Sequence, residues 1–136
     1  YYLSYGDGTV STIGAFVNPL LCWGGLLALP VLAYRAWKRD RTALFLLVGY
    51  LAQVLPWVFI SRLTFEYHYF AATLFLVLAL GYVFDRLRRR GYLGIVYAFT
   101  AANGVLFALF YPVLTGVTIP RDYAWNVLKW LPDWPF

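Results

Sequence analysis

The sequence lacks methionine altogether, and its 136 residues include only one cysteine and one histidine. Cys22 therefore has no partner for an internal disulfide, and because it lies in an apolar stretch we expect a small buried side chain. One His and one Cys are too few for a zinc site. The sequence also has no Gly-rich phosphate loop and no Ser-His-Asp set with useful spacing. We therefore expect no metal ion and no cofactor in this chain.

Charged residues are also scarce. They make up 12% of the chain, whereas hydrophobic residues make up 62%. That is too little charge to cover the surface of a soluble domain of this size. The net charge of +5 raises the question of nucleic acid. However, the basic residues cluster at the ends of apolar stretches, where they meet anionic lipid headgroups. The expected partner is therefore the lipid bilayer, with no nucleic acid.

Long apolar stretches are what the sequence has instead. A membrane-spanning helix needs about 20 mostly apolar residues, and lipid leaves backbone groups no partner outside the segment, so the stretches should be helical. Asn18 followed by Pro19 is a typical helix start. The predicted fold class is an all-α integral membrane protein, a bundle of four transmembrane helices. The four helices are predicted at about 18–37, 42–60, 67–84 and 91–111.

The basic residues are distributed unevenly between these stretches. Loops rich in Lys and Arg stay on the cytoplasmic side. We therefore predict a multi-pass protein of the cell membrane, with both ends of this chain and the 61–67 turn facing outward. Two gaps hold eight of the eleven basic residues, namely Arg35, Lys38, Arg39 and Arg41 in the first and Arg86, Arg88, Arg89 and Arg90 in the second.

The tail from 120 to 136 has a different pattern. In a helix at about 122–131, Trp125, Leu128 and Leu131 fall on one face, with Asn126 and Lys129 on another. Its aromatic side chains favour the headgroup zone of a membrane. We predict a short amphipathic helix along the outer membrane surface.

Most of the polar side chains that could bind a ligand or take part in a reaction lie between 56 and 70. Arg62 and Glu66 are four residues apart and would pair on a helical turn. His68 and Tyr69 stand where the third helix begins, near the positive end of its dipole. Together these groups would suit an anion. The alternative is that Arg62 and Glu66 are an interfacial anchor and that His68 is a packed, hydrogen-bonded side chain.

Four segments together resemble the C-terminal four-helix region of the protein O-mannosyltransferase family. They occur in the family's order and cover essentially the whole chain. They are Arg62 to Phe70 with its His68-Tyr69-Phe70 core; Ser11-Thr12-Ile13 followed by Asn18-Pro19 and Trp23-Gly24; Tyr111-Pro112 with Gly116; and Trp130-Leu131-Pro132-Asp133-Trp134.

This resemblance implies part of an inverting glycosyltransferase of the GT-C type. The parent enzyme would transfer mannose from a polyprenyl or dolichyl phosphate to Ser or Thr of exported proteins. By the same resemblance, Arg62, His68 and Tyr69 would bind the donor phosphate, with Glu66 supporting them. Tyr67 stands where many members have a second His, which favours a prokaryotic relative.

The family's catalytic Asp-Glu pair belongs to an N-terminal half and has no counterpart here. The chain begins at Tyr1 without a methionine, so we expect it to be the C-terminal piece of a longer protein. No catalytic residue is therefore expected in 1–136, and the fragment alone should be inactive. A non-enzymatic assembly or transporter module is the alternative, as is a related enzyme acting on a lipid or cell-wall glycan. The exact sugar and the oligomeric state, including a dimer, stay open.

Overall fold

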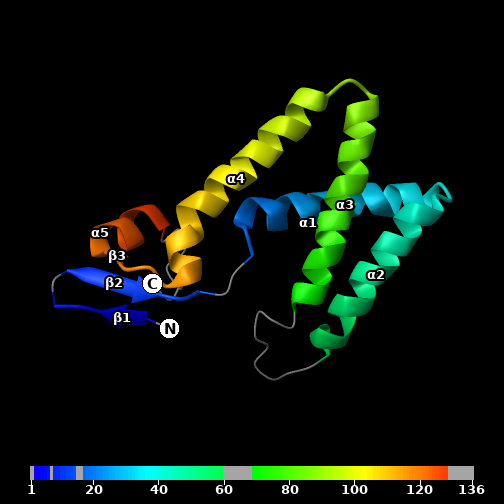
Figure 1. Cartoon of the computed structure of the whole chain (residues 1–136). Coiled ribbons are helices and arrows are strands. Elements are labelled where there is room, and N and C mark those ends of the chain that lie inside the picture. Colours follow the sequence, from blue (N-terminus) through cyan, green and yellow to red (C-terminus); the bar gives the residue numbers. More distant parts are fainter. Residues whose placement is uncertain (1, 7, 15–16, 60–68, 129–136) are drawn as a thin grey trace. The chain divides into compact units, whose positions relative to one another are not determined.

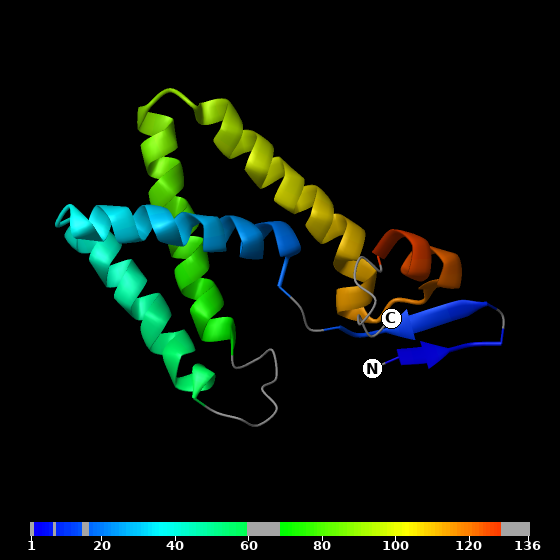
Figure 2. The ribbon, with the colours of Figure 1, turned by 180° about the vertical axis from the view of Figure 1, so that it is seen from behind.

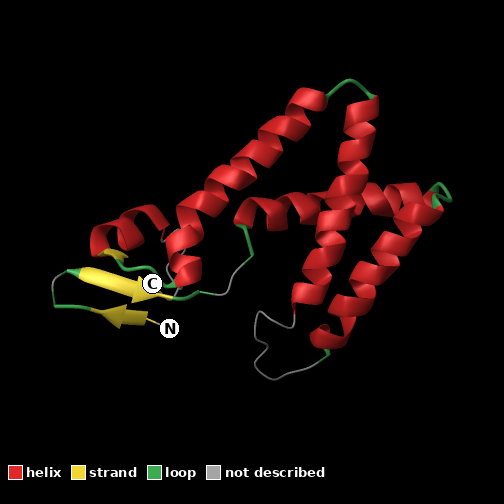
Figure 3. Cartoon of the chain, viewed as in Figure 1, coloured by secondary structure: helices red, strands yellow, loops and turns green. Residues whose placement is uncertain are grey.

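The computed structural model describes the chain except for residues 1, 7, 15–16, 60–68 and 129–136. Within the described residues, four helices are long and apolar enough to cross a membrane. This confirms the predicted fold class. Figure 3 shows how far helices dominate the described part of the chain. The four are α1 (Pro19–Trp37), α2 (Arg41–Val58), α3 (Phe70–Arg89) and α4 (Leu93–Thr115).

The chain divides into two compact units, which are described separately. The helical unit is Val17–Asn103, and the mixed unit is Tyr1–Phe16 together with Gly104–Phe136. The boundary falls inside α4, so its first turns belong to the helical unit and its last turns to the mixed unit.

Apolar side chains of α1, α2 and α3 form the core of the helical unit. α1 crosses α3 while α2 runs beside it, as Figures 1 and 2 show from opposite sides. Two buried clusters hold the helices together. Glycines let the backbones approach closely, since a Cβ added to Gly25 would lie 2.7 Å from Cβ of Leu76. The clusters contain Ala28, Leu32, Ala43, Leu46 and Ala79 in one and Tyr50, Ala72 and Leu76 in the other.

Each of the first two helices begins with a residue whose side chain caps the helix N-terminus. The Asn18 Oδ1 accepts hydrogen bonds from the backbone N–H groups of Leu20 at 3.0 Å and Leu21 at 3.4 Å. Pro19 fills the first helical position, where its missing N–H does no harm. Asp40 caps α2 in the same way. The predicted helix start at Asn18-Pro19 is therefore observed.

The later helices run past the predicted ends. α3 continues to Arg89 instead of ending at 84, because basic side chains suit the negative end of a helix dipole. α4 ends at Thr115 instead of at 111 and contains Pro112. The helix stops before Gly116, whose φ of 74° is the left-handed conformation typical of a helix end. The Val117 N–H then bonds the Pro112 carbonyl at 3.1 Å.

The mixed unit contains a small antiparallel sheet that the sequence analysis did not predict (Figure 3). Its strands, in spatial order, are β1 (Tyr2–Ser4), β2 (Thr9–Thr12) and β3 (Ile119–Pro120). Tyr2 pairs with Thr12, and Thr9 with Pro120. The strands were missed because each is too short to show a period-2 pattern.

The tail helix packs against this sheet unit through Ala124 and Leu128. It consists of α5 (Arg121–Tyr123) and a π-helical turn η2 (Ala124–Leu128), and residues 129 onward lie outside the described part. Leu128 is fully buried and Trp125 is 45% exposed, whereas Leu131 of the predicted face lies outside the described residues. Ala124 is buried with Leu128 because residues four apart share a helix side. A position on the outer membrane surface stays a prediction.

Candidate functional site

Only one residue of the predicted anion site falls in the described part of the chain. Arg62, Glu66 and His68 lie outside the described residues. Tyr69 is described, and it occupies the N-cap position of α3 without a capping bond from its side chain. Whether the four side chains come together therefore stays a prediction.

Tyr69 is held in place by a partner on the neighbouring helix. Its hydroxyl lies 2.8 Å from the hydroxyl of Tyr50 in α2, and either can donate. The Tyr69 carbonyl accepts a hydrogen bond from Thr73 Oγ1 at 3.2 Å. The ring packs against the buried cluster that contains Tyr50, Ala72 and Leu76. Two phenols from different helices thus meet beside the beginning of α3.

The surroundings of Tyr69 keep its hydroxyl protonated. Burial, and next the hydrogen bond with Tyr50, raise the pKa of Tyr69 above its ordinary value. A pair of phenols carries two protons, and their mutual hydrogen bond uses one of them. When Tyr50 donates to Tyr69, the Tyr69 proton is available to an acceptor outside the pair. The arrangement can therefore present a neutral, fixed donor to an anion.

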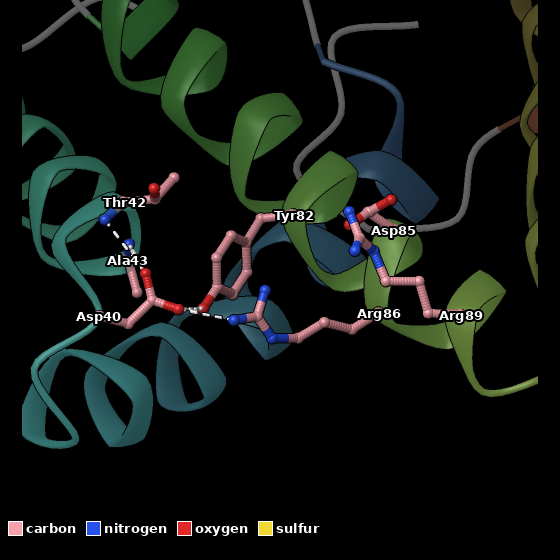
Figure 4. A network of polar contacts seen from close by, with 7 residues as sticks. All are labelled: Asp40, Thr42, Ala43, Tyr82, Asp85, Arg86 and Arg89. Atoms are coloured by element: carbon pink, nitrogen blue, oxygen red, sulfur yellow. Dashed lines mark hydrogen bonds and ion pairs between the residues drawn. The ribbon is translucent and has the colours of Figure 1, made fainter.

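A second polar network joins the opposite ends of the same helices. The Asp40 carboxylate accepts from the Tyr82 hydroxyl and from the Arg86 guanidinium, each at 2.6 Å. The Arg86 guanidinium also stacks on the Tyr82 ring, 3.9 Å from its centroid. Figure 4 shows Tyr82 and Arg86 reaching from α3 toward Asp40. We call these three residues the Asp40 network.

Hydrogen bonding in this network favours the charged form of Asp40. The bond from Tyr82 lowers the pKa of Asp40 most, followed by the N–H of Ala43. Desolvation opposes them, and the positive charge of Arg86 adds to the lowering. Asp40 thus caps α2 with one carboxylate oxygen, at 3.1 Å from the Thr42 nitrogen, and ties α3 with the other.

The Asp40 network was not predicted, because the two basic gaps indicated only the orientation of the helices in the membrane. Asp40 stands among four basic residues, so nothing in the sequence indicates which of them it would pair with. Its actual partner comes from the other gap, 46 residues away. A lone acidic residue in a basic membrane-boundary loop was the signal available.

The described carboxylates of the helical unit, Asp40 and Asp85, do not provide a base beside Tyr69. Asp85 pairs with Arg88 at 3.1 Å and Arg89 at 2.8 Å. At about 1.5 Å per helical residue, Asp85 lies about 24 Å along α3 from Tyr69. Among the described residues, no group of three or more His, Cys, Asp or Glu side chains could hold a metal ion.

The described helices define a multi-pass integral membrane protein. Residues 9–134 match the model of the C-terminal four-transmembrane region of protein O-mannosyltransferase. The chain belongs to that family, which confirms the resemblance found in the sequence.

Two relatives are named polyprenol-phosphate-mannose–protein mannosyltransferase. The protein from Mycobacterium tuberculosis (strain CDC 1551 / Oshkosh) is 37% identical over 132 residues, covering 86% of this chain and 24% of the relative. The protein from Mycolicibacterium smegmatis (strain ATCC 700084 / mc(2)155) is 33% identical over 125 residues, covering 79% of this chain and 23% of the relative. The chain thus spans about a quarter of the relatives' length, and both relatives are prokaryotic, as expected. No solved structure shows significant similarity to the chain.

Proposed function

We propose that this chain is the C-terminal membrane region of an enzyme that transfers mannose from a polyprenyl phosphate to Ser or Thr hydroxyls of exported proteins. The observation that carries the proposal is the family match over residues 9–134. The names of both relatives support this donor and a protein acceptor. We place the ends of the chain and residues 61–67 outside the cell, where exported proteins are, because the basic gaps favour the cytoplasmic side.

The transfer reaction needs two functions, a base that deprotonates the acceptor hydroxyl and groups that stabilise the departing phosphate. The acceptor hydroxyl oxygen forms a bond to C1 of mannose while the bond from C1 to the phosphate oxygen breaks. The hydroxyl proton passes to a carboxylate base, and the polyprenyl phosphate leaves with the bonding electrons. The described carboxylates of the helical unit, Asp40 and Asp85, are engaged with arginines. In this proposal the share of this chain is binding the leaving phosphate.

In this proposal Arg62, His68 and Tyr69 bind the phosphate, and Glu66 orients Arg62. Arg62 supplies charge and a planar fork of donors. Tyr69 supplies a hydroxyl whose direction is restricted by its 2.8 Å contact with Tyr50. The first turn of α3 adds unpaired N–H groups and partial positive charge. Such donors accelerate transfer when they bind the phosphate more strongly as it departs.

A pair of phenylalanine substitutions tests the role of Tyr69 in the full-length, membrane-inserted enzyme. Tyr69→Phe and Tyr50→Phe both break the same hydrogen bond, but only Tyr69→Phe removes the hydroxyl assigned to the phosphate. Losing one such donor typically lowers the rate about a hundredfold. With radiolabelled polyprenyl-phosphate mannose and a Ser/Thr peptide, we expect Tyr69→Phe to lose far more activity than Tyr50→Phe. Equal losses would mean that the hydroxyl pair is only structural.

Arg62 and His68 are tested in the same assay. Arg62→Lys keeps the charge but loses the fork, so we expect most activity to be lost with weaker donor binding. Full activity of a well-expressed Arg62→Lys, His68→Ala double variant would refute the phosphate site. Label that appears in lipid or glycan instead of peptide would show a different acceptor. Absence of transfer by the wild-type enzyme to any of them would refute the enzymatic proposal itself.

A further inference from the structure

A cavity of about 290 Å³ lies between the last turns of α1 and α3, within the helical unit. Three arginines line it, Arg35 from α1, Arg86 from α3 and Arg90 from the end of α3. We call this cavity the arginine pocket. With Arg90 at one end of α3 and Tyr69 at the other, the pocket is about 30 Å from the candidate donor site.

The arginine pocket carries an excess of positive charge. Asp40 neutralises Arg86, at 2.6 Å. The other described carboxylate on these helices, Asp85, pairs outside the pocket with Arg88 and Arg89. Among the described residues, neither Arg35 nor Arg90 has an ion-pair partner within 4.0 Å. Two arginines that line the same pocket therefore lack an ion-pair partner among the described residues, and an anion bound there would balance their positive charge.

The pocket is also partly pre-organised. Arg86 is held by its bond to Asp40 and by its stacking on Tyr82, so it loses little freedom when a ligand binds. Its guanidinium still has further N–H donors, because Asp40 accepts from a single terminal nitrogen. The pocket thus offers one fixed and two adjustable arginines to an acidic group.

The remaining walls of the pocket are apolar. Val31, Val83 and Leu87 supply aliphatic surface, and Tyr34 also lines the pocket. Val31 and Val83 precede the arginines by about one helical turn, so they lie farther into the candidate membrane spans. Trp37, at the end of α1, is 86% exposed, and Trp favours the interface between lipid and water. The arginines therefore lie at the membrane boundary, and the apolar wall of the pocket lies next to them, toward the hydrocarbon core of the membrane.

We propose that the arginine pocket binds the headgroup of an anionic phospholipid. The phosphate lies among Arg35, Arg86 and Arg90, and the first part of an acyl chain lies along Val31, Val83 and Leu87. Basic pockets between transmembrane helices suit acidic lipid headgroups because both charge and apolar surface are matched. A free phosphate would use the arginines and leave the apolar walls unoccupied. The apolar walls of the pocket therefore favour a lipid over a soluble anion.

A charge-matched pair of double variants tests this proposal in the full-length protein. Arg35→Gln, Arg90→Gln removes the two arginines that lack a described counter-charge. Arg88→Gln, Arg89→Gln removes the same number of charges just outside the pocket. The probe is phosphatidylglycerol titrated into phosphatidylcholine nanodiscs, with bound lipid counted by native mass spectrometry. We expect the pocket variant to bind phosphatidylglycerol about tenfold more weakly, with the outer variant close to wild type. If both variants bind phosphatidylglycerol equally weakly, the effect is due to net charge alone and the proposal is wrong.

Two further measurements use the wild-type protein and need no variant to fold. Photoactivatable phosphatidylglycerol should label segments 31–35 and 83–90, and labelling confined to other segments would overturn the site. Millimolar inorganic phosphate should leave this labelling unchanged. If phosphate abolishes it, the pocket is a site for free anions and the lipid assignment is wrong. These outcomes are independent of mannose transfer.

Discussion

Gly25 provides a direct test of how α1 and α3 pack. A methyl group at this position would lie 2.7 Å from Cβ of Leu76 and 3.3 Å from its Cγ. The Cβ atom is fixed to the backbone of α3, so a change of rotamer cannot move it away. Gly25→Ala therefore forces the two helices apart or distorts one of them. Overpacking of this kind typically costs about 1–3 kcal/mol.

Gly81 in α3 is the matched control. It also lies in the interior of a transmembrane helix, but a Cβ there would meet nothing within 4 Å. Both Ala variants gain the same helix propensity, about 1 kcal/mol over Gly, so the difference between them isolates the contact with Leu76. We expect Gly25→Ala to be less stable than Gly81→Ala by about 1–3 kcal/mol.

To measure this difference in stability, the full-length variants are kept in mild detergent micelles and unfolded by adding increasing amounts of SDS. Adding Leu76→Ala to Gly25→Ala should give little recovery, because alanine keeps the Cβ atom that makes the closest contact. Equal stability of Gly25→Ala and Gly81→Ala would refute the close packing of α1 on α3. Full recovery in the double variant would show that the outer part of the leucine side chain, and not the backbone spacing, limits the approach.

Three further predictions concern the helix ends. Gly116→Ala should destabilise the protein more than Gly91→Ala in thermal unfolding, by about 1 kcal/mol or more, because both have positive φ but only Gly116 has a crowded Cβ position. The pKa of Asp40 is lowered in the folded state, so its contribution is present above its unfolded pKa and lost on acidification. Between about pH 5 and pH 2, wild type should therefore lose more stability than Asp40→Asn. Finally, Arg39→Cys and Arg89→Cys should resist an impermeant thiol reagent in intact cells, and labelling of either would reverse the proposed orientation.

The transmembrane helices could be predicted because lipid imposes one solution on each apolar stretch. The start at Asn18 and Pro19 followed from local chemistry alone, since a cap needs only the next few residues. The ends were harder. The fourth helix was predicted to end at 111, just before Pro112, yet α4 continues for three residues beyond this proline until Gly116 supplies the left-handed conformation. Proline is tolerated inside transmembrane helices, and α4 stays helical to Thr115.

The partners in the candidate site could not be predicted, because they depend on the register between helices. The sequence indicated Tyr69 but gave no reason to choose Tyr50, which lies 19 residues earlier on another helix. Which side chains meet is decided by packing, for example by the close approach of Phe75 to Gly49. The arginine pocket was hidden for the same reason, since Arg35 and Arg90 are brought together only when α1 packs on α3.

The mixed unit shows why separate weak motifs can belong to one physical feature. Ser11 Oγ donates to the Gly116 carbonyl at 2.8 Å across 105 residues of sequence. Ile13 lies so close to Gly116 that a Cβ there would be 2.9 Å from its Cγ1. The segment before the first helix and the turn after the last one are therefore two sides of a single contact. Glycine is needed at 116 for its φ of 74° and for this contact together. Ile13 and Gly116 are far apart in the sequence, so the need for glycine at this contact becomes visible only in the fold.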